Sequence, residues 1–169
     1  IGLNLAGVAN SSASVINSYA TGNVNGPSTN GGMNYWAGGL IGQNTASASG
    51  ANASVTGSYF TGNISVTASW LGGLIGLNQA NGANSVVDIS NSYTTGTVFN
   101  NPTGGVAVGT GGLVGLNRSG GSNASMKIQS SYATGAVTGT QYTGGLVGWT
   151  KANNSANATK PSKNRLGEI

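Results

Sequence analysis

The sequence has no cysteine and no histidine, and its 169 residues include six Lys or Arg and two Asp or Glu. Without cysteine the chain can form neither a disulfide framework nor a thiolate metal site. The two acids, Asp88 and Glu168, lie far apart in the chain, so no carboxylate pair is available for glycoside hydrolysis or a calcium site. Serines are common, but a serine nucleophile needs a nearby base, and the local candidate within the repeats is Lys127, which lies near Ser125 and Ser130. We therefore expect no enzyme activity, no metal and no cofactor.

Charge is scarce in the body of the chain. The net charge is +4, but most of the cations come after residue 150: Lys151, Lys160, Lys163 and Arg165. Binding to a phosphate backbone needs Lys and Arg clustered along one face, so we expect no nucleic-acid partner. No apolar run approaches the roughly 20 residues of a membrane span, so we expect none.

The sequence is rich in repetition. One motif occurs four times, at residues 38–44, 72–78, 111–117 and 144–150, and reads Gly-Gly-Leu-(Ile/Val)-Gly-x-Asn with Thr150 in the last copy. A second motif alternates with it, at residues 17–22, 57–62, 91–96 and 130–135, and contains Ser-Tyr-x-Thr-Gly. Self-similarity at a fixed period indicates a stacked-repeat architecture.

The spacing of the motifs is fixed on one side and variable on the other. The step from the motif Leu to the next Tyr is always 19 residues, whereas the return step varies from 14 to 21. Insertions confined to one side of a repeat are typical of loops gathered on one face. We assign residues 1–150 to the repeats and 151–169 to a basic linker or tail. Because Ile1 aligns with Ile75, inside a motif, we expect the chain to be a segment of a longer protein.

Each repeat is composed of strand-forming residues. Thr, Val, Ile and Tyr recur between glycines, and no apolar stripe of period 3.6 appears. About three strands per repeat are expected. A coil that returns to its start would stack like residues as ladders at the ~4.8 Å strand spacing. We predict an all-β fold, a right-handed parallel β-solenoid of about four coils with 33–40 residues per coil.

Two side-chain ladders should result. The tyrosines follow a Val or Ile by four residues and should share its buried strand face, with a binding role as the alternative; they are Tyr19, Tyr59, Tyr93 and Tyr132. A row of threonines could present regularly spaced hydroxyls, as ice-binding solenoids do; it comprises Thr21, Thr61, Thr95 and Thr134.

Aromatic residues also gather on the variable side of the repeats. We predict that they bind a ligand, as stacking platforms for carbohydrate; they are Tyr35, Trp36, Trp70, Phe99 and Tyr142.

Successive side chains on a regular strand point to opposite faces, so only one residue of each Leu-(Ile/Val) pair can face inward. If Leu faces inward, the outward row is an apolar strip of Ile41, Ile75, Leu77, Val114, Leu116, Val147 and Trp149. Exposed strips of this kind mark contact surfaces, which predicts self-association or docking to the rest of the parent chain. The alternative is that the variable loops fold over the strip.

The alternation of the two motifs resembles the GLUG repeat of large bacterial surface proteins, found in filamentous-haemagglutinin-like adhesins and in the stalk of some immunoglobulin A peptidases. The resemblance covers roughly residues 1–150, with departures at Gly57, Ser130 and Thr150. It implies an exported, extracellular β-helical segment at the bacterial cell surface, serving as a rigid stalk or a contact with host or neighbouring-cell glycans or proteins. It implies no enzyme. The alternative function is a carbohydrate-binding module that uses the loop aromatics.

Overall fold

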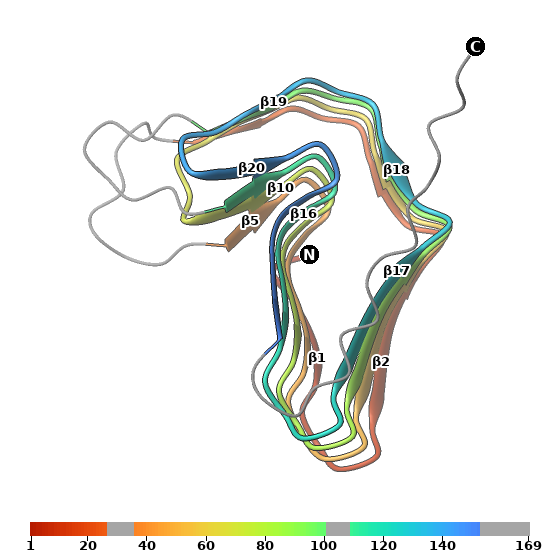
Figure 1. Cartoon of the computed structure of the whole chain (residues 1–169). Coiled ribbons are helices and arrows are strands. Elements are labelled where there is room, and N and C mark those ends of the chain that lie inside the picture. The colour runs from red at the N-terminus through yellow and green to blue at the C-terminus, as the bar shows by residue number, and fades with distance from the viewer. Residues whose placement is uncertain (27–35, 101–108, 153–169) are drawn as a thin grey trace.

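The chain winds as a stack of coils that lie almost on top of one another (Figure 1). The computed structural model describes residues 1–26, 36–100 and 109–152, and every regular element in these ranges is a β-strand. All strand pairs are parallel and join equivalent strands of successive coils. The predicted parallel β-solenoid of about four coils is confirmed. Each full coil contains five short strands rather than the three expected.

The strands form five sheets, each made of one strand per coil. The motif sheet contains β1 (Leu3–Ala6), β6 (Ile41–Ala46), β11 (Ile75–Ala80), β16 (Val114–Ser119) and β21 (Val147–Ala152). The facing sheet contains β2 (Ser12–Ile16), β7 (Asn52–Thr56), β12 (Val86–Ser90) and β17 (Ser125–Gln129). The tyrosine sheet contains β3 (Tyr19–Ala20), β8 (Tyr59–Phe60), β13 (Tyr93–Thr94) and β18 (Tyr132–Ala133).

The bridging sheet and the return sheet complete each coil on the side of the variable loops. The bridging sheet contains β4 (Val24–Asn25), β9 (Ile64–Ser65), β14 (Val98–Phe99) and β19 (Val137–Thr138). The return sheet contains β5 (Trp36–Gly38), β10 (Trp70–Gly72), β15 (Gly109–Gly111) and β20 (Tyr142–Gly144).

The register of the sheets matches the alignment of the motifs. Ile75 pairs with Ile41 on one side and Val114 on the other. At the start of the chain Leu3 pairs with Gln43, as the alignment of Ile1 with Ile75 requires. At the end, β21 continues to Ala152, so Lys151 belongs to the last strand and not to the tail.

The Gly-Gly pair of the motif allows the chain to reverse between the return sheet and the motif sheet. A Cβ on Gly72 would overlap the carbonyl oxygen of Ile75, and one on Gly73 would overlap the carbonyl oxygen of Gly112. Only glycine therefore fits where the backbone folds back on itself and on the next coil. Leu74 lies inside this bend, before strand β11 begins at Ile75.

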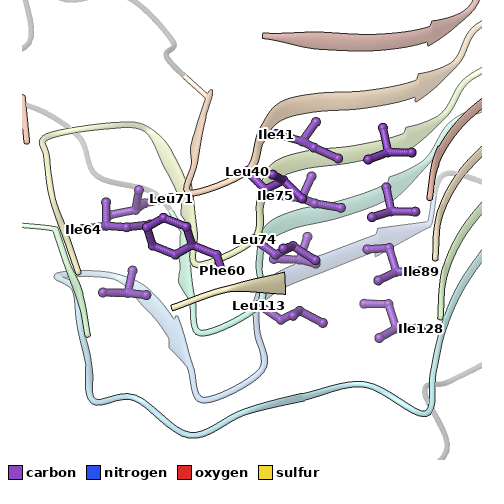
Figure 2. Packing of buried hydrophobic residues seen from close by; sticks show 14 of the residues in the cluster. Leu40, Ile41, Phe60, Ile64, Leu71, Leu74, Ile75, Ile89, Leu113 and Ile128 are labelled. Atoms are coloured by element: carbon purple, nitrogen blue, oxygen red, sulfur yellow. The ribbon is translucent and has the colours of Figure 1, made fainter. Parts of the chain in front are cut away.

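The main core takes buried side chains from all five sheets, among them Ile41, Phe60, Ile64, Leu71 and Ile89 (Figure 2). Both apolar residues of the motif enter it, since Leu74, Ile75, Leu113 and Val114 have no exposed surface. The bend at Leu74 breaks the alternation of a regular strand, so neighbours in sequence can both point inward. Phe60 fills the space beside the bend of its own coil and is 1 % exposed.

A second core of small residues joins the motif sheet to the facing sheet. It contains Ala6, Ala46, Ala51, Ala53, Ala80, Val87, Ala124 and Met126. The alanines allow the two sheets to converge at the end of the coil opposite the return sheet (Figure 1).

Between the two cores runs a ladder of asparagine side chains. Asn44 Nδ2 donates to Asn78 Oδ1 at 2.7 Å, and Asn78 Nδ2 donates to Asn117 Oδ1 at 2.8 Å. Asn4 begins the ladder by donating to Asn44 Oδ1 at 2.7 Å. Buried amides are thus satisfied by their equivalents in the next coil, as burial requires.

Candidate functional site

The return sheet packs against the outer side of the motif sheet. A Cβ on Gly76 would lie 2.6 Å from the backbone nitrogen of Ala37, and one on Gly115 would lie 2.7 Å from that of Leu71. The glycine at this motif position therefore lets the two backbones touch. Figure 1 shows the resulting re-entrant corner, in which β5, β10 and β20 lie beside β16.

The prediction of an exposed apolar strip on the outer face is wrong. Ile41, Ile75 and Val114 are fully buried in the main core, and Val147 is half-buried against it. The bend at the glycine pair places both apolar residues inside, so no exposed row remains.

Leu77, Leu116 and Trp149 do face outward in the motif sheet. The alternate residues Asn78 and Ala80 face the interior, so Leu77 points the other way. Even so, Leu77 is 3 % exposed and Leu116 is 6 % exposed. The packed return sheet accounts for this cover, in line with the alternative that the variable side folds over the strip.

Three aromatic rings meet in the re-entrant corner at the last coils. Trp149 in β21 stacks on Tyr142 in β20, with ring centroids 4.8 Å apart and planes at 24°. Trp70 in β10 lies 5.3 Å from Trp149, with planes at 33°. Trp70 reaches across Gly109, where a Cβ would come within 2.8 Å of its ring. We call Trp70, Tyr142 and Trp149 the aromatic corner.

Two cations lie on the same face as the aromatic corner. Lys151 Nζ lies 5.7 Å from the ring centroid of Trp149. Arg118 is the register partner of Lys151 in the adjacent strand β16, as Leu116 is of Trp149. The Arg118 Nε atom is buried and has no hydrogen-bond partner within the described part of the chain.

Of the four predicted loop aromatics that the structure describes, the aromatic corner contains two, Trp70 and Tyr142. Trp36 pairs in register with Trp70 and is 41 % exposed. Phe99 is exposed on the bridging sheet, away from the corner. Tyr35 lies outside the described residues.

Sequence reasoning missed the position of Arg118 and Lys151 beside this corner. The sequence pattern places Lys151 in the tail, because the motif ends at Thr150. The alignment of the last two motifs already contained the signal, since it places Trp149 beside Leu116 and Lys151 beside Arg118.

The tyrosine ladder is on the surface, so the prediction that it is buried is wrong. Tyr19 is 63 % exposed and Tyr132 is 49 % exposed, while Tyr59 and Tyr93 are half-buried between their neighbours. The rings form one stack, with centroids 4.9 to 5.1 Å apart and planes within 7°. Burial raises the pKa of Tyr93 above 10.0, and the flanking phenols Tyr59 and Tyr132 raise it further.

A left-handed turn explains the inverted direction of the tyrosines. The residue two positions before each tyrosine has positive φ: 48° at Asn17, 60° at Gly57, 50° at Asn91 and 47° at Ser130. This turn flips the alternation, so the serine after it points inward and the tyrosine points outward. Ser58 and Ser92 are accordingly fully buried, and the Ser58 amide donates to Ser92 Oγ at 3.2 Å.

The threonine row is exposed in every coil, at Thr21, Thr61, Thr95 and Thr134. Because the residue between each Tyr and Thr faces inward, the threonines form a second column beside the tyrosines. The row of hydroxyls is therefore present on the surface, and its use as an ice-binding array stays a prediction.

Among the described residues, no group of three or more His, Cys, Asp or Glu is placed to hold a metal ion. Nor does any helix in those ranges have the length and apolar character to cross a membrane. The chain matches no protein-family model, no curated protein and no solved structure. The resemblance to the GLUG repeat therefore stays a prediction that the two motifs carry.

Proposed function

We propose that this chain is a structural and adhesive module of an exported bacterial surface protein, without enzyme activity of its own. The observation that carries the proposal is the unbroken register of five parallel sheets. Each coil is tied to the next by backbone hydrogen bonds and by the asparagine ladder, so the coils act as one rigid body. A surface made mostly of amides and hydroxyls, with few charged groups, suits a module that presents contacts rather than reacting groups.

Force spectroscopy tests the structural part of the proposal. The full chain, inserted between two marker domains, should resist pulling and then lose one coil at a time, because strand pairing joins each coil to the coils next to it. Release of 33–40 residues should lengthen the chain by roughly 110–140 Å per step. If the chain extended without resistance, the proposed role as a rigid stalk would be contradicted.

A second function, carbohydrate binding, is favoured by the aromatic corner. Aromatic rings offer broad apolar faces together with polar edges, and such surfaces hold sugar rings. Tyr142 is 49 % exposed, so part of the cluster is accessible. The tyrosine ladder is less suitable, because its ring faces are already covered by one another.

A glycan array probed with the labelled full chain tests the second function. Trp149→Ala should abolish binding, whereas Phe99→Ala removes an exposed aromatic elsewhere and should leave it unchanged. Equal binding by both variants would exclude the aromatic corner, and no binding by the unmodified chain would exclude the function.

A further inference from the structure

We infer that the aromatic corner takes an acidic carbohydrate, whose carboxylate is held by Arg118 and Lys151 while its ring packs on the aromatic side chains. This inference rests on the carbohydrate-binding function proposed above. It is carried by three observations on the motif sheet: an adjacent pair of cations, the lack of a counter-ion, and a buried donor without a partner.

The cation pair is fixed by the register of β16 and β21. Arg118 and Lys151 are Cα partners on neighbouring parallel strands, about 4.8 Å apart across the sheet. Like charges directly opposite each other destabilise a sheet. A bound anion would offset this repulsion, because a carboxylate can accept from both side chains at once.

The protein supplies no counter-ion within the described residues of this sheet. The one carboxylate side chain that the structure describes is Asp88, which lies on β12 of the facing sheet beside Lys127. Its strand belongs to a different sheet from Arg118 and Lys151. The positive charge in the corner is therefore unopposed by any described side chain.

The Arg118 side chain has unused donor capacity. Its Nε is buried without a hydrogen-bond partner among the described residues, and buried donors are almost always satisfied in folded proteins. A guanidinium offers a planar set of donors that matches a carboxylate in two parallel hydrogen bonds. An acidic ligand would supply the acceptor.

The aromatic side chains place the rest of the ligand beside this charge. Lys151 Nζ lies over the Trp149 ring, and Tyr142 and Trp70 extend the apolar surface from there. A sugar acid combines an apolar ring face with a carboxylate on the same ring, and so fits both parts. A nucleic acid fits less well, because two cations cannot follow a row of phosphates.

The test measures binding of the labelled full chain to uronic-acid and sialic-acid oligosaccharides, each printed beside its methyl ester. The ester keeps the ring and removes the charge. We expect at least about tenfold tighter binding to some acids than to their esters, and weaker binding of those acids in higher salt. Arg118→Gln should remove the difference between acid and ester. Lys127→Gln is the matched control, because it removes one exposed cation from the facing sheet, and it should change nothing.

Circular dichroism checks that Arg118→Gln folds; if it does not, Lys151→Gln takes its place, since Lys151 is exposed in the last strand. Equal binding of acids and esters would overturn the inference and leave the carbohydrate function standing. Binding of neither would overturn both. Preferential binding of polyuridylate that depends on Arg118 would also overturn the inference and identify a nucleic-acid ligand instead.

Discussion

The tyrosine ladder and the aromatic corner are both built from stacked rings, but they arise in opposite ways. In the ladder the same residue occupies the same position in every coil, and each ring covers the faces of its neighbours. In the corner the rings come from different positions: Trp70 in the return sheet meets Trp149, which stands where the coil before it has Leu116. Repetition therefore yields columns of rings that cover one another, whereas departures from the repeat bring unlike aromatic side chains and two cations together.

Both groups of rings depend on an intact stack of coils. Of the substitutions considered, Val114→Asp should lower the stability of this stack most. Val114 is fully buried between coils, so the new carboxylate has neither water nor a partner. We expect a loss of about 4 kcal/mol or more in the free energy of unfolding, and a urea transition that broadens or splits. Val8→Asp, at a residue 72 % exposed, is the control. A single unchanged transition in Val114→Asp would contradict the stacked core.

The interior column of asparagines should be the next most sensitive. Asn78→Ala removes one of the two hydrogen bonds of Asn44 Nδ2, which keeps only the 3.4 Å bond to the Ala53 carbonyl oxygen, and takes away the donor to Asn117 Oδ1. Each orphaned buried group costs about 1–3 kcal/mol, so we expect a loss of about 2 kcal/mol or more, measured from the urea midpoint. Asn25→Ala, on an exposed residue of β4, should change stability by less than about 0.5 kcal/mol. If the two variants were equally stable, the ladder would contribute nothing.

The tyrosine ladder should affect stability without affecting ligand binding. Tyr93 stacks on two rings and Tyr19 on one, and each aromatic pair contributes about 0.5–1.5 kcal/mol. Tyr93→Ala should therefore cost about 1–3 kcal/mol in urea unfolding, about twice the cost of Tyr19→Ala. Both variants should bind glycans as the unmodified chain does. Loss of glycan binding in Tyr93→Ala would erase the distinction between the ladder and the corner.

The smallest change in stability should come from raising the pH until Tyr93 ionises. The pKa of Tyr93 is raised in the folded chain, so folding favours its neutral form. Its contribution to stability is complete below the unfolded value of about 10 and is lost as pH rises through the folded pKa. Absorbance at the phenolate band should show one tyrosine ionising late, and Tyr93→Phe should remove that step. A titration of the unmodified chain that lacks this late step would contradict the stacking effect.

Much of the fold could be predicted from the sequence, because spacing alone sets the register. The constant step from Leu74 to Tyr93 and its equivalents requires coils that stack, and the pairing of Ile75 with Ile41 and Val114 confirms it. The direction of side chains was harder to predict. Alternation holds only within a strand, and both errors fall at bends: the left-handed turn at Asn17 and the reversal at Gly72.

The candidate site was harder to predict from the sequence than the fold, because it depends on contacts between coils. Trp70 and Tyr142 stand out as aromatic residues, but their meeting with Trp149 requires the return sheet to fold against the motif sheet. No local pattern indicates that layer, since its strands have three residues each. Asn and Gly before the tyrosines, by contrast, are residues that favour positive φ, and they would have indicated the turn.

The connections between the bridging and return sheets differ greatly in length, yet the strands on both sides of them pair in the same register. Ten residues separate β4 from β5, four separate β9 from β10, nine separate β14 from β15 and three separate β19 from β20. Trp70 still pairs with Trp36 and with Gly109. Lengthening a surface loop is cheap, at roughly 0.6 kcal/mol for each doubling. Each coil thus has one connection whose length can change while the strands on both sides of it keep their register with the neighbouring coils.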